Sequence, residues 1–500
     1  MSLLSRRRAL MSALKRLIYT VFGASPLTLL KCFKGTAVNY KIEGNSVQDG
    51  TPTPDTPVEV ESVGERTKNL LNPKATLTTL LNLYKGVDVM EYIAQNTILS
   101  IKLKEGKSAP SGVYFGVVYK LSTSDTMGYW LIDNGVLKTT AFNLKQLGDT
   151  VTHMGIGVYP ATQANWDKIF ECFDVQLELG TTATPYEPFG KYKVPVVTQG
   201  KNLFDKSIPY DDYLVIIGYR YLLIWVGKGN TVTVSLSQKH PMGLGGYCYI
   251  RDNGTDSGGY QEQKWLYHNT NDGLCKKSQT FTSVDGYVSV YFNITAYNNF
   301  KDELQVEYGT TATDFEPYQE PTITNIYLNE PLRKVGEYAD YVDFANGKVV
   351  RNIKEVATTS VYGIYGKLTD VIRFSAYLST LNGRLGTYEM YSNYLKYVKE
   401  SWYENNETIF KHNSDKAHYY ISLSRERLGI TDEDTDTEMV NKANAFIKTL
   451  NNPKVYYATN TPTEELIDLP QLPTLEGTTI YSVDTTIQPS NMEVSYYGRP

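Results

Sequence analysis

The chain of 500 residues is long enough for roughly three domains, and its formal net charge of −5 argues against a general nucleic-acid-binding protein, which would carry a basic domain. Charged residues make up 21% of the chain and hydrophobic residues 41%, which excludes a chain that is disordered as a whole. Tyr is unusually frequent, at 41 residues, and favours half-exposed strands and surfaces that contact polar ligands, so the composition favours β-rich modules over a helical enzyme.

The first 35 residues form a basic segment, with seven Lys and Arg side chains and no acidic one. Apolar side chains recur in it at helical spacing and predict a helix of about five turns. So short an apolar seam cannot bury itself, so we expect residues 1–35 to oligomerise or to dock onto another protein; a helix on a membrane surface is the alternative. Basic residues interrupt any secretion signal, and the apolar part is too short to span a bilayer. The seam consists of Leu10, Leu14, Leu17 and Val21.

A proline-rich connector is expected over residues 36–67. Its central run, Thr51–Pro57, contains three Pro residues, which predict a stiff, extended spacer and exclude an interior strand. The alternation of apolar and polar residues over Val58–Val63 then predicts a strand.

An internal repeat is the strongest signal in the sequence. Residues Lys68–Asn72 return as Lys201–Asp205, and residues Phe173–Phe189 return in large part as Asp302–Tyr318. The two matched ends recur at nearly the same spacing, so they enclose two copies of one domain of about 120 residues, too long a period for a solenoid of small repeats.

Each copy, at residues 68–190 and 191–320, is expected to be a β-sandwich. Short alternating apolar runs stand between turn clusters without a long helix, which is typical of antiparallel sandwiches and jelly rolls. The predicted fold class is therefore mainly β, with two tandem homologous jelly-roll domains. The expected strands include Val113–Tyr119, Val232–Leu236 and Gly286–Ile294.

A third, different module, β-rich with one packed helix, is expected over residues 321–500. Tyr338–Phe344 and Lys348–Arg351 alternate on either side of an Asn-Gly turn and predict a hairpin. Residues 438–450 carry an apolar face at helical spacing and predict a helix. The last expected strands are Val455–Ala458, Thr478–Tyr481 and Met492–Tyr496.

Catalytic chemistry is not visible in the sequence. Glu178 and Glu307 occupy repeated strand positions, which the duplication of a domain explains without catalysis. Asp432, Asp434 and Asp436 imitate the start of a calcium loop, but the Gly and Glu that the loop needs are missing. We interpret them as charges that stabilise the start of the following helix. We therefore predict no enzyme, no catalytic residues, no metal site and no cofactor.

The cysteines are too sparse for a disulfide framework. We interpret them as free thiols, and a bridge between Cys248 and Cys275 is the alternative.

Aromatic side chains among polar ones form the candidate site. In the second copy, a stretch rich in Gly, Asn and Asp holds Tyr260, Trp265 and Tyr267. A ring can cover the apolar side of a sugar while amides and carboxylates bind its hydroxyls, so this is a candidate carbohydrate site. The alternative is that Trp265 only packs the stretch onto the sandwich. Trp402 and Tyr403 form a weaker candidate. The remaining tryptophans lie in apolar runs and are expected in the core: Trp130, Trp166 and Trp225.

Several motifs are specific in combination: Tyr40–Asp55, the Lys-Asn-Leu/Phe start and the Gln-x-Glu-x-Gly-Thr-Thr-Ala-Thr end of the repeats, Tyr338–Val350, and Leu472–Tyr481. Together they resemble tail-associated structural proteins of phages and prophages of Gram-positive bacteria, over residues 25–498. The resemblance implies carbohydrate-binding-like β-sandwiches mounted on a tail tip, baseplate or fibre. It also implies adhesion to surface glycans of the host or a role as a spacer, and it brings no catalytic residues.

We therefore interpret the chain as a non-enzymatic virion protein of a phage tail or baseplate, whose sandwiches bind host cell-surface carbohydrate during adsorption. Its expected partners are other tail or baseplate proteins, through residues 1–35, further copies of itself in a cyclic oligomer, for which we favour a trimer, and host cell-wall glycan, but no nucleic acid. The alternatives are a purely architectural tail protein, a polysaccharide depolymerase and, more distantly, a surface adhesin of the bacterium itself.

Overall fold

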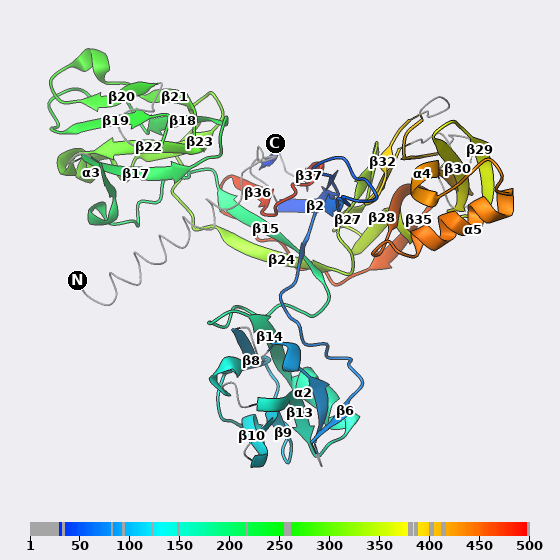
Figure 1. The fold of residues 1–500 in the computed structure, drawn as a ribbon. Coiled ribbons are helices and arrows are strands. Elements are labelled where there is room, and N and C mark those ends of the chain that lie inside the picture. The colour runs from blue at the N-terminus through cyan, green and yellow to red at the C-terminus, as the bar shows by residue number, and fades with distance from the viewer. Residues whose placement is uncertain are drawn as a thin grey trace. The chain divides into compact units, whose positions relative to one another are not determined.

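The computed structural model describes residues 30–32, 36–81, 84–92, 96–122, 124–147, 151–216, 219–254, 262–378, 384, 389–399, 405–411 and 417–497. Strands dominate over helices, so the predicted mainly β fold class is confirmed (Figure 1). The chain divides into two compact units. One comprises Glu65–Lys193 and Tyr327–Glu330, and the other comprises the rest of the described chain.

The first unit contains a β-sandwich that we call sandwich 1. Its larger sheet has the strand order β11-β10-β9-β13-β7-β6, and its smaller sheet has the order β12-β8-β14. Phe115 and Leu177 are fully buried in the core between the sheets, where the helix α2 (Gln163–Cys172) adds Trp166, as the sequence predicts. The strands are β6 (Thr78–Leu81), β7 (Tyr84–Asp88), β8 (Thr97–Leu103), β9 (Tyr114–Leu121), β10 (Ser124–Asp133), β11 (Val136–Leu137), β12 (Ala141–Asn143), β13 (Val151–Tyr159) and β14 (Phe173–Leu179).

The second unit contains a further β-sandwich, sandwich 2. Its larger sheet has the order β16-β17-β22-β19-β20, and its smaller sheet has the order β21-β18-β23. Val234, Val290 and Phe300 lie in its core, the last of them on the helix α3 (Ile294–Phe300). The strands are β16 (Leu214–Ile216), β17 (Tyr219–Trp225), β18 (Thr231–Leu236), β19 (Tyr247–Arg251), β20 (Gln263–His268), β21 (Ser278–Thr282), β22 (Tyr287–Phe292) and β23 (Leu304–Tyr308).

The two sandwiches share one topology. The order β10-β9-β13-β7-β6 in sandwich 1 corresponds strand by strand to β20-β19-β22-β17-β16 in sandwich 2, and β12-β8-β14 corresponds to β21-β18-β23. In both, a short helix precedes the last strand; its N-cap side chain, Thr162 or Asn293, accepts a hydrogen bond from the backbone three residues on. The sequence does not predict these two helices. The sequence repeat thus coincides with a repeat of strand order, while the boundaries 68–190 and 191–320 stay a prediction.

The repeated sequence motifs form a hydrogen-bonded cluster that we call the closing latch. In sandwich 1, the buried Glu178 carboxylate accepts from the backbone N–H of Thr184 (2.7 Å) and from its hydroxyl (2.6 Å). Glu307 accepts the same two bonds from Thr313, at 2.8 and 2.7 Å. The repeated pattern therefore hydrogen-bonds the last strand of each sandwich to the tail that follows it. This structural role explains the repeated Glu without catalysis. The latch side chains are Asn69, Gln176, Glu178 and Thr184 in sandwich 1, and Asn202, Gln305, Glu307 and Thr313 in sandwich 2.

The segments that follow the two sandwiches are strands of one sheet, with the order β1-β36-β15-β24. A second sheet, β31-β35-β28-β27-β2-β37, pairs the early strand β2 with the late strand β37 and contains the predicted hairpin β27–β28. Residues near both ends of the described chain are thus adjacent. The strands are β1 (Leu30–Cys32), β2 (Thr36–Glu43), β15 (Tyr192–Gly200), β24 (Thr322–Leu328), β27 (Tyr341–Asp343), β28 (Lys348–Ala357), β31 (Met390–Ser392), β35 (Lys454–Leu466), β36 (Thr479–Val483) and β37 (Asn491–Tyr497).

The C-terminal part of the chain adds a five-stranded sheet, β29-β30-β34-β33-β32, and the helix α5 (Asp436–Ile447). This helix covers most of the predicted helix at residues 438–450, and a capping box of Thr435 and Glu438 fixes its start. Met439 and Ile447 pack into the core beneath it. The remaining elements are β29 (Gly363–Lys367), β30 (Val371–Tyr377), β32 (Lys396–Tyr397), β33 (Thr408–Phe410), β34 (His418–Ser424), α4 (Arg425–Leu428) and the two-residue strands β3 (Ser46–Val47), β4 (Glu61–Ser62), β5 (Glu65–Arg66), β25 (Lys334–Val335) and β26 (Tyr338–Ala339).

The connector differs from the extended spacer that its prolines predict. Thr53 and Thr56 exchange two backbone hydrogen bonds, at 3.1 and 3.2 Å, so the run folds into a tight turn. Pro54 is buried at the tip of this turn, and Asp55 forms a bidentate ion pair with Arg427, at 2.8 and 2.7 Å. The prediction of a stiff, extended spacer is therefore wrong, because the run turns back on itself and Pro54 packs against the C-terminal part of the chain. Of the predicted strand Val58–Val63, only β4 forms.

The predicted N-terminal helix lies largely outside the described residues. Only residues 30–32 of the basic segment 1–35 are described, and they form the strand β1, which pairs with β36. The proposed docking role of this segment stays a prediction.

Candidate functional site

The residues predicted to bind carbohydrate have different fates. Tyr260, Trp402 and Tyr403 lie outside the described residues. Tyr267 is fully buried in the core of sandwich 2, and its hydroxyl accepts a hydrogen bond from the backbone N–H of Leu244 (2.7 Å), so its ring is not available to a ligand. Trp265 is half-buried on the outer face of the larger sheet, the face that is turned away from the core. Of the two described members of the set, Trp265 remains a candidate contact, and Tyr260, Trp402 and Tyr403 stay predictions.

A β-bulge places Trp265 and Tyr267 on opposite faces of the sheet. Trp265 pairs with Tyr249, and Tyr267 pairs with Cys248, so that Leu266 is the extra residue on β20. Leu266 and Tyr267 consequently both point into the core, while Trp265 points outward. Strict alternation, which places every second residue on one face, fails at this position.

Sandwich 1 has the same arrangement at Trp130. This residue pairs with Gly116, and Ile132 pairs with Phe115, so that Leu131 is the extra residue of an equivalent bulge. Leu131 and Ile132 are fully buried in the core, and Trp130 is half-buried outside it. The expectation that Trp130 belongs to the core is therefore wrong, because the bulge turns it to the outer face. Trp225, on β17, is likewise half-buried outside the core and packs edge-on against Tyr287.

Each outer-face Trp has a Tyr partner on the neighbouring strand. The ring centroids of Tyr114 and Trp130 lie 6.1 Å apart at an interplanar angle of 62°. Those of Tyr247 and Trp265 lie 6.0 Å apart at 65°. Tyr114 and Tyr247 both stand two residues before the residue that pairs with the Trp. We call these the Tyr–Trp pairs; they recur at equivalent positions with nearly equal geometry.

The pairs border a row of residues that runs across three neighbouring strands of the same face. In sandwich 1 this cross-strand row is all glycine, and in sandwich 2 it is all tyrosine. The strand register shows that the two rows occupy equivalent positions, because in each row the residue on the central strand is directly paired with the residues on both neighbouring strands. The row consists of Gly86, Gly157 and Gly116 in sandwich 1, and of Tyr221, Tyr291 and Tyr249 in sandwich 2.

The tyrosine row of sandwich 2 forms a buried, hydrogen-bonded cluster. The hydroxyls of Tyr221 and Tyr249 share a hydrogen bond of 2.7 Å, and Tyr249 stacks on Tyr291 at a centroid distance of 4.4 Å. The Arg251 guanidinium lies 5.2 Å from the Tyr221 ring centroid and 5.6 Å from that of Tyr249. Burial, together with the bond to Tyr221, raises the pKa of Tyr249 well above its usual range. Trp265 and His268 continue this cluster, with ring centroids 4.8 Å apart.

The glycine row of sandwich 1 reflects close strand packing. A Cβ atom on Gly116 would lie 2.2 Å from the carbonyl oxygen of Tyr129, and one on Gly86 would lie 1.9 Å from that of Ile156. Side chains are therefore excluded from the row, and the Leu80 side chain lies over its middle, beside Gly157. The Tyr–Trp pair of sandwich 1 consequently lies beside a stretch of sheet without side chains, whereas that of sandwich 2 lies beside other tyrosines.

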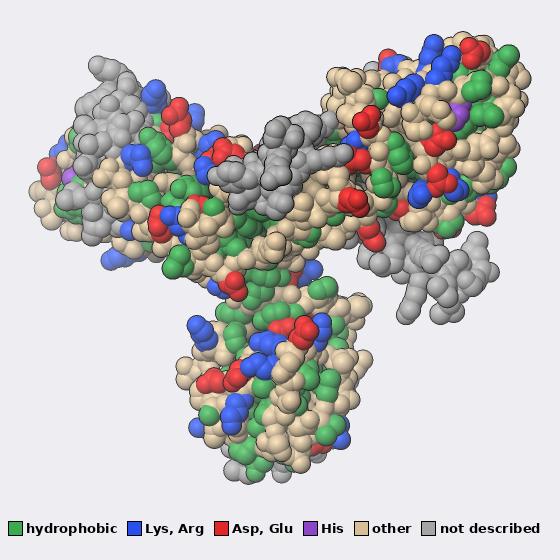
Figure 2. Space-filling model, turned by 180° about the vertical axis from the view of Figure 1, so that it is seen from behind, with side chains coloured by type: hydrophobic (Ala, Val, Ile, Leu, Met, Phe, Trp, Pro, Cys, Tyr) green, Lys and Arg blue, Asp and Glu red, His purple; other side chains and the backbone are tan. Residues whose placement is uncertain are grey.

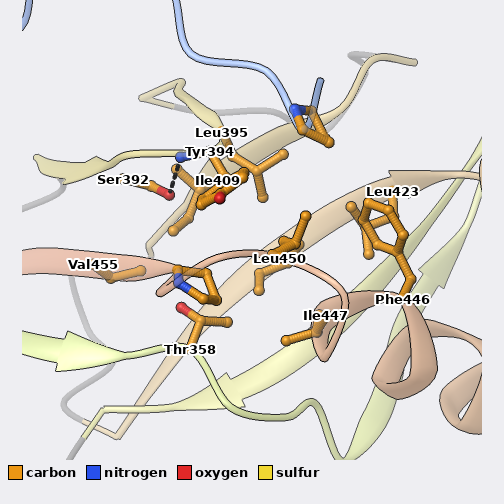
Figure 3. Close-up of a pocket in the computed structure, with 13 residues that line it drawn as sticks. Thr358, Ser392, Tyr394, Leu395, Ile409, Leu423, Phe446, Ile447, Leu450 and Val455 are labelled. Carbon is orange, nitrogen blue, oxygen red and sulfur yellow. Dashed lines mark hydrogen bonds between the residues drawn. The ribbon is translucent and has the colours of Figure 1, made fainter. Parts of the chain in front are cut away.

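One pocket lies in the C-terminal part of the chain, between α5 and the strands β33 and β34 (Figure 3). Leu395, Phe446 and other apolar side chains line it, and Pro54 of the connector lies at its rim. The hydrogen bond drawn there runs from the backbone N–H of Tyr394 to the Ser392 hydroxyl (3.2 Å). The few polar groups of this pocket come from Ser, Thr and Tyr. We therefore interpret it as a gap in apolar packing, against which the connector turn lies, and not as a binding site.

Other kinds of site find no support among the described residues. No group of His, Cys, Asp and Glu there could hold a metal ion, and no helix there is long and apolar enough to cross a membrane. The acidic residues near α5 pair with cations; Asp434, for example, lies 2.7 Å from the Lys442 ammonium. Cys248 and Cys275 are free, buried thiols, and burial raises the pKa of Cys248. Lys and Arg side chains are interspersed with Asp and Glu on the face drawn in Figure 2.

Comparisons of the chain with models of protein families, with curated proteins and with solved structures found no match.

The Tyr–Trp pair of sandwich 1 was not predicted from the sequence, yet a signal for it exists. Both copies contain Trp-Leu followed by a further apolar residue, at Trp130–Ile132 and Trp265–Tyr267. Both also contain Tyr-x-Gly/Tyr on the preceding strand, at Tyr114–Gly116 and Tyr247–Tyr249. Alignment of the interiors of the two copies, in addition to their ends, would have revealed the pairs.

Proposed function

We propose that the protein is a non-enzymatic adhesion protein of a phage tail, whose two sandwiches bind cell-surface carbohydrate through the Tyr–Trp pairs. The observation that carries this proposal is the recurrence of one pair, with equal geometry, on the outer faces of both sandwiches. A side chain outside the core contributes less to folding, so its repetition favours a role in binding.

The chemistry of the pair favours a sugar over other ligands. Two rings at an interplanar angle of about 60° form a corner in which one ring can cover the apolar face of a pyranose, and Tyr and Trp each add a polar group at the ring edge. Single-stranded nucleic acid also stacks on aromatic rings, but it requires a positively charged groove, which the net charge of −5 does not favour.

The place of the protein in a phage tail rests on the motifs that resemble tail-associated proteins. In that setting, residues 1–35 dock onto other tail proteins or join copies of the chain into a cyclic oligomer, such as a trimer. Several weak sugar sites on several copies then give firm adhesion through their effective concentration. The protein is accordingly a virion component that is made in the cytoplasm of the bacterial host.

Binding of the full chain to purified cell walls, with soluble wall polysaccharide as competitor, tests the proposal. The variants are Trp130→Ala, Trp265→Ala and the double variant. Tyr129→Ala is the matched control, because Tyr129 is a partly exposed ring next to Trp130 but lies on the opposite face of the strand, where it stacks on Phe142 at 3.9 Å. We expect the double variant to lose saturable, competed binding and the control to retain it.

Three results would replace the proposal. Wall binding that survives in the double variant would place the site elsewhere, and no binding by the wild-type protein at any valency would favour an architectural tail protein. Release of reducing ends from the polysaccharide would instead indicate a depolymerase.

A further inference from the structure

Sandwich 1 carries a third exposed ring in line with its Tyr–Trp pair. Tyr159 on β13 is directly paired with Tyr114 on β9, and its side chain is 38% exposed. The ring centroids of Tyr159 and Tyr114 lie 6.1 Å apart, the same distance as between Tyr114 and Trp130. The three residues stand on adjacent strands in the order β13-β9-β10. We call them the aromatic rank; they extend across the strands at a nearly constant interval.

Sandwich 2 lacks the third ring. Its equivalent position, two residues after Tyr291, is Asn293, because Tyr159 stands two residues after Gly157. The Asn293 side chain accepts hydrogen bonds from the backbone N–H groups of Tyr247 (3.2 Å) and Ala296 (2.9 Å), so it serves to cap α3. Among the described residues beside this position, the Tyr–Trp pair and His268 are the half-buried rings in mutual contact.

Neighbouring rings of the rank are steeply inclined to one another. The interplanar angle is 59° between Tyr159 and Tyr114 and 62° between Tyr114 and Trp130. These angles exceed the rotation of about 20–25° between adjacent strands of a sheet, so they reflect the orientation of the rings and not the sheet twist alone. Rings inclined in this way do not form a flat platform. They fit a ligand whose successive units are rotated relative to one another.

From this geometry we infer that sandwich 1 binds an extended, twisted single chain of polysaccharide, with about three consecutive sugar units against Tyr159, Tyr114 and Trp130. Sandwich 2, which has Asn293 in place of the ring of Tyr159, binds a shorter unit. The inference rests on the proposed carbohydrate-binding function and adds to it a ligand class, a direction across the strands, and a difference between the two sandwiches. It excludes a flat, crystalline polysaccharide surface as the ligand of sandwich 1.

The test uses the full chain with Trp265→Ala, so that binding reports on sandwich 1, and a size series of fragments from partly hydrolysed wall polysaccharide. Affinity should rise from two-unit to four-unit fragments and then level off. Adding Tyr159→Ala should weaken binding of the four-unit fragment by about threefold to tenfold and that of the two-unit fragment by less than about twofold. Tyr159→Phe, which keeps the ring, should bind as the parent does.

Tyr186→Ala is the matched control, because Tyr186 is 37% exposed in the same sandwich but lies outside the rank. Affinity that does not depend on fragment length, an equal effect of Tyr159→Ala and Tyr186→Ala, or tight binding to insoluble crystalline polysaccharide would overturn the inference while leaving carbohydrate binding intact. Failure of every fragment and of the intact polysaccharide to bind the wild-type protein would overturn the proposed function and the inference with it.

Discussion

Sandwich 1 and sandwich 2 have the same strand order and the same closing latch, but opposite residues in the cross-strand row. Glutamates 178 and 307 accept the same bonds at nearly the same distances. The row, by contrast, changes from the smallest residue to one of the largest. What closes the fold has thus been kept after duplication, whereas the outer face has diverged.

This difference gives the Tyr–Trp pairs their significance. They lie on the face that has diverged, directly beside the row, and nevertheless they have the same identity and geometry in both sandwiches. Packing does not require this, because Trp130 has a glycine as its direct cross-strand neighbour and Trp265 has a tyrosine. A shared ligand chemistry accounts for a feature that survives where its surroundings have changed.

The largest expected effect concerns the shared part, the latch. The side-chain oxygen Oδ1 of Asn69 accepts hydrogen bonds from the backbone N–H groups of Leu71 (3.0 Å) and Leu177 (3.1 Å), and that of Asn202 accepts the equivalent bonds. Asn69→Ala and Asn202→Ala leave buried N–H groups unsatisfied, so each should destabilise its own sandwich by about 3 kcal/mol. Hydrogen exchange of β14 and β23 measures the two opening free energies separately.

The control for the latch is Asn72→Ala, because the Asn72 side chain accepts a hydrogen bond from the nearby Lys74 N–H at the surface, and its loss should matter little. A large loss in one sandwich without the equivalent loss in the other would contradict the view that the latch is what the copies share.

A smaller effect is expected from the glycine row. A Cβ atom on Gly116 would overlap the Tyr129 carbonyl oxygen at 2.2 Å, so Gly116→Ala should push β9 and β10 apart and destabilise sandwich 1 by about 2 kcal/mol. Gly366→Ala, in β29, is the control, because the nearest atom to its Cβ is 3.8 Å away. Hydrogen exchange of β9 compares the variants. If Gly116→Ala were as stable as the wild-type protein, close strand packing would not explain the row.

The sequence predicts the fold better than the site. Alternating apolar runs and the two matched repeat ends predict two β-sandwiches, and an apolar face at helical spacing predicts α5. The helices α2 and α3 are not predicted, because seven to ten residues with few apolar positions give too weak a period. The connector is mispredicted because Asp55 has its partner in Arg427, far along the chain.

Trp130 and Tyr267 lie on other faces than the sequence predicts, for a local reason. A bulge directly after Trp130 and directly after Trp265 adds one residue to each strand. The alternation between core and surface therefore shifts by one residue at the bulge, which leaves Trp130 on the outer face and puts Tyr267 in the core. No feature of a single copy marks the bulge, since Leu131 and Leu266 are ordinary strand residues. The cross-strand row is invisible for the same reason, because its members lie far apart in sequence and meet only through strand register.

The smallest expected effect concerns the tyrosine row at alkaline pH. Burial raises the pKa of Tyr249 in the folded protein above the value of about 10 that it has in the unfolded chain. The neutral phenol therefore stabilises sandwich 2 fully below pH 10, and this contribution is lost as the pH rises through the folded pKa, by about 1.4 kcal/mol per pH unit for one group. The glycine row of sandwich 1 contains no group that titrates. At pH 7, Tyr249→Phe should destabilise sandwich 2 by about 1 kcal/mol, because it loses the 2.7 Å hydrogen bond to Tyr221. Above pH 10, the same variant should lose less stability with rising pH than the wild-type protein does. Hydrogen exchange of β19, corrected for the pH dependence of the intrinsic exchange rates, measures both effects. An unchanged alkaline slope in this variant would mean that Tyr249 is not the group that distinguishes the two faces.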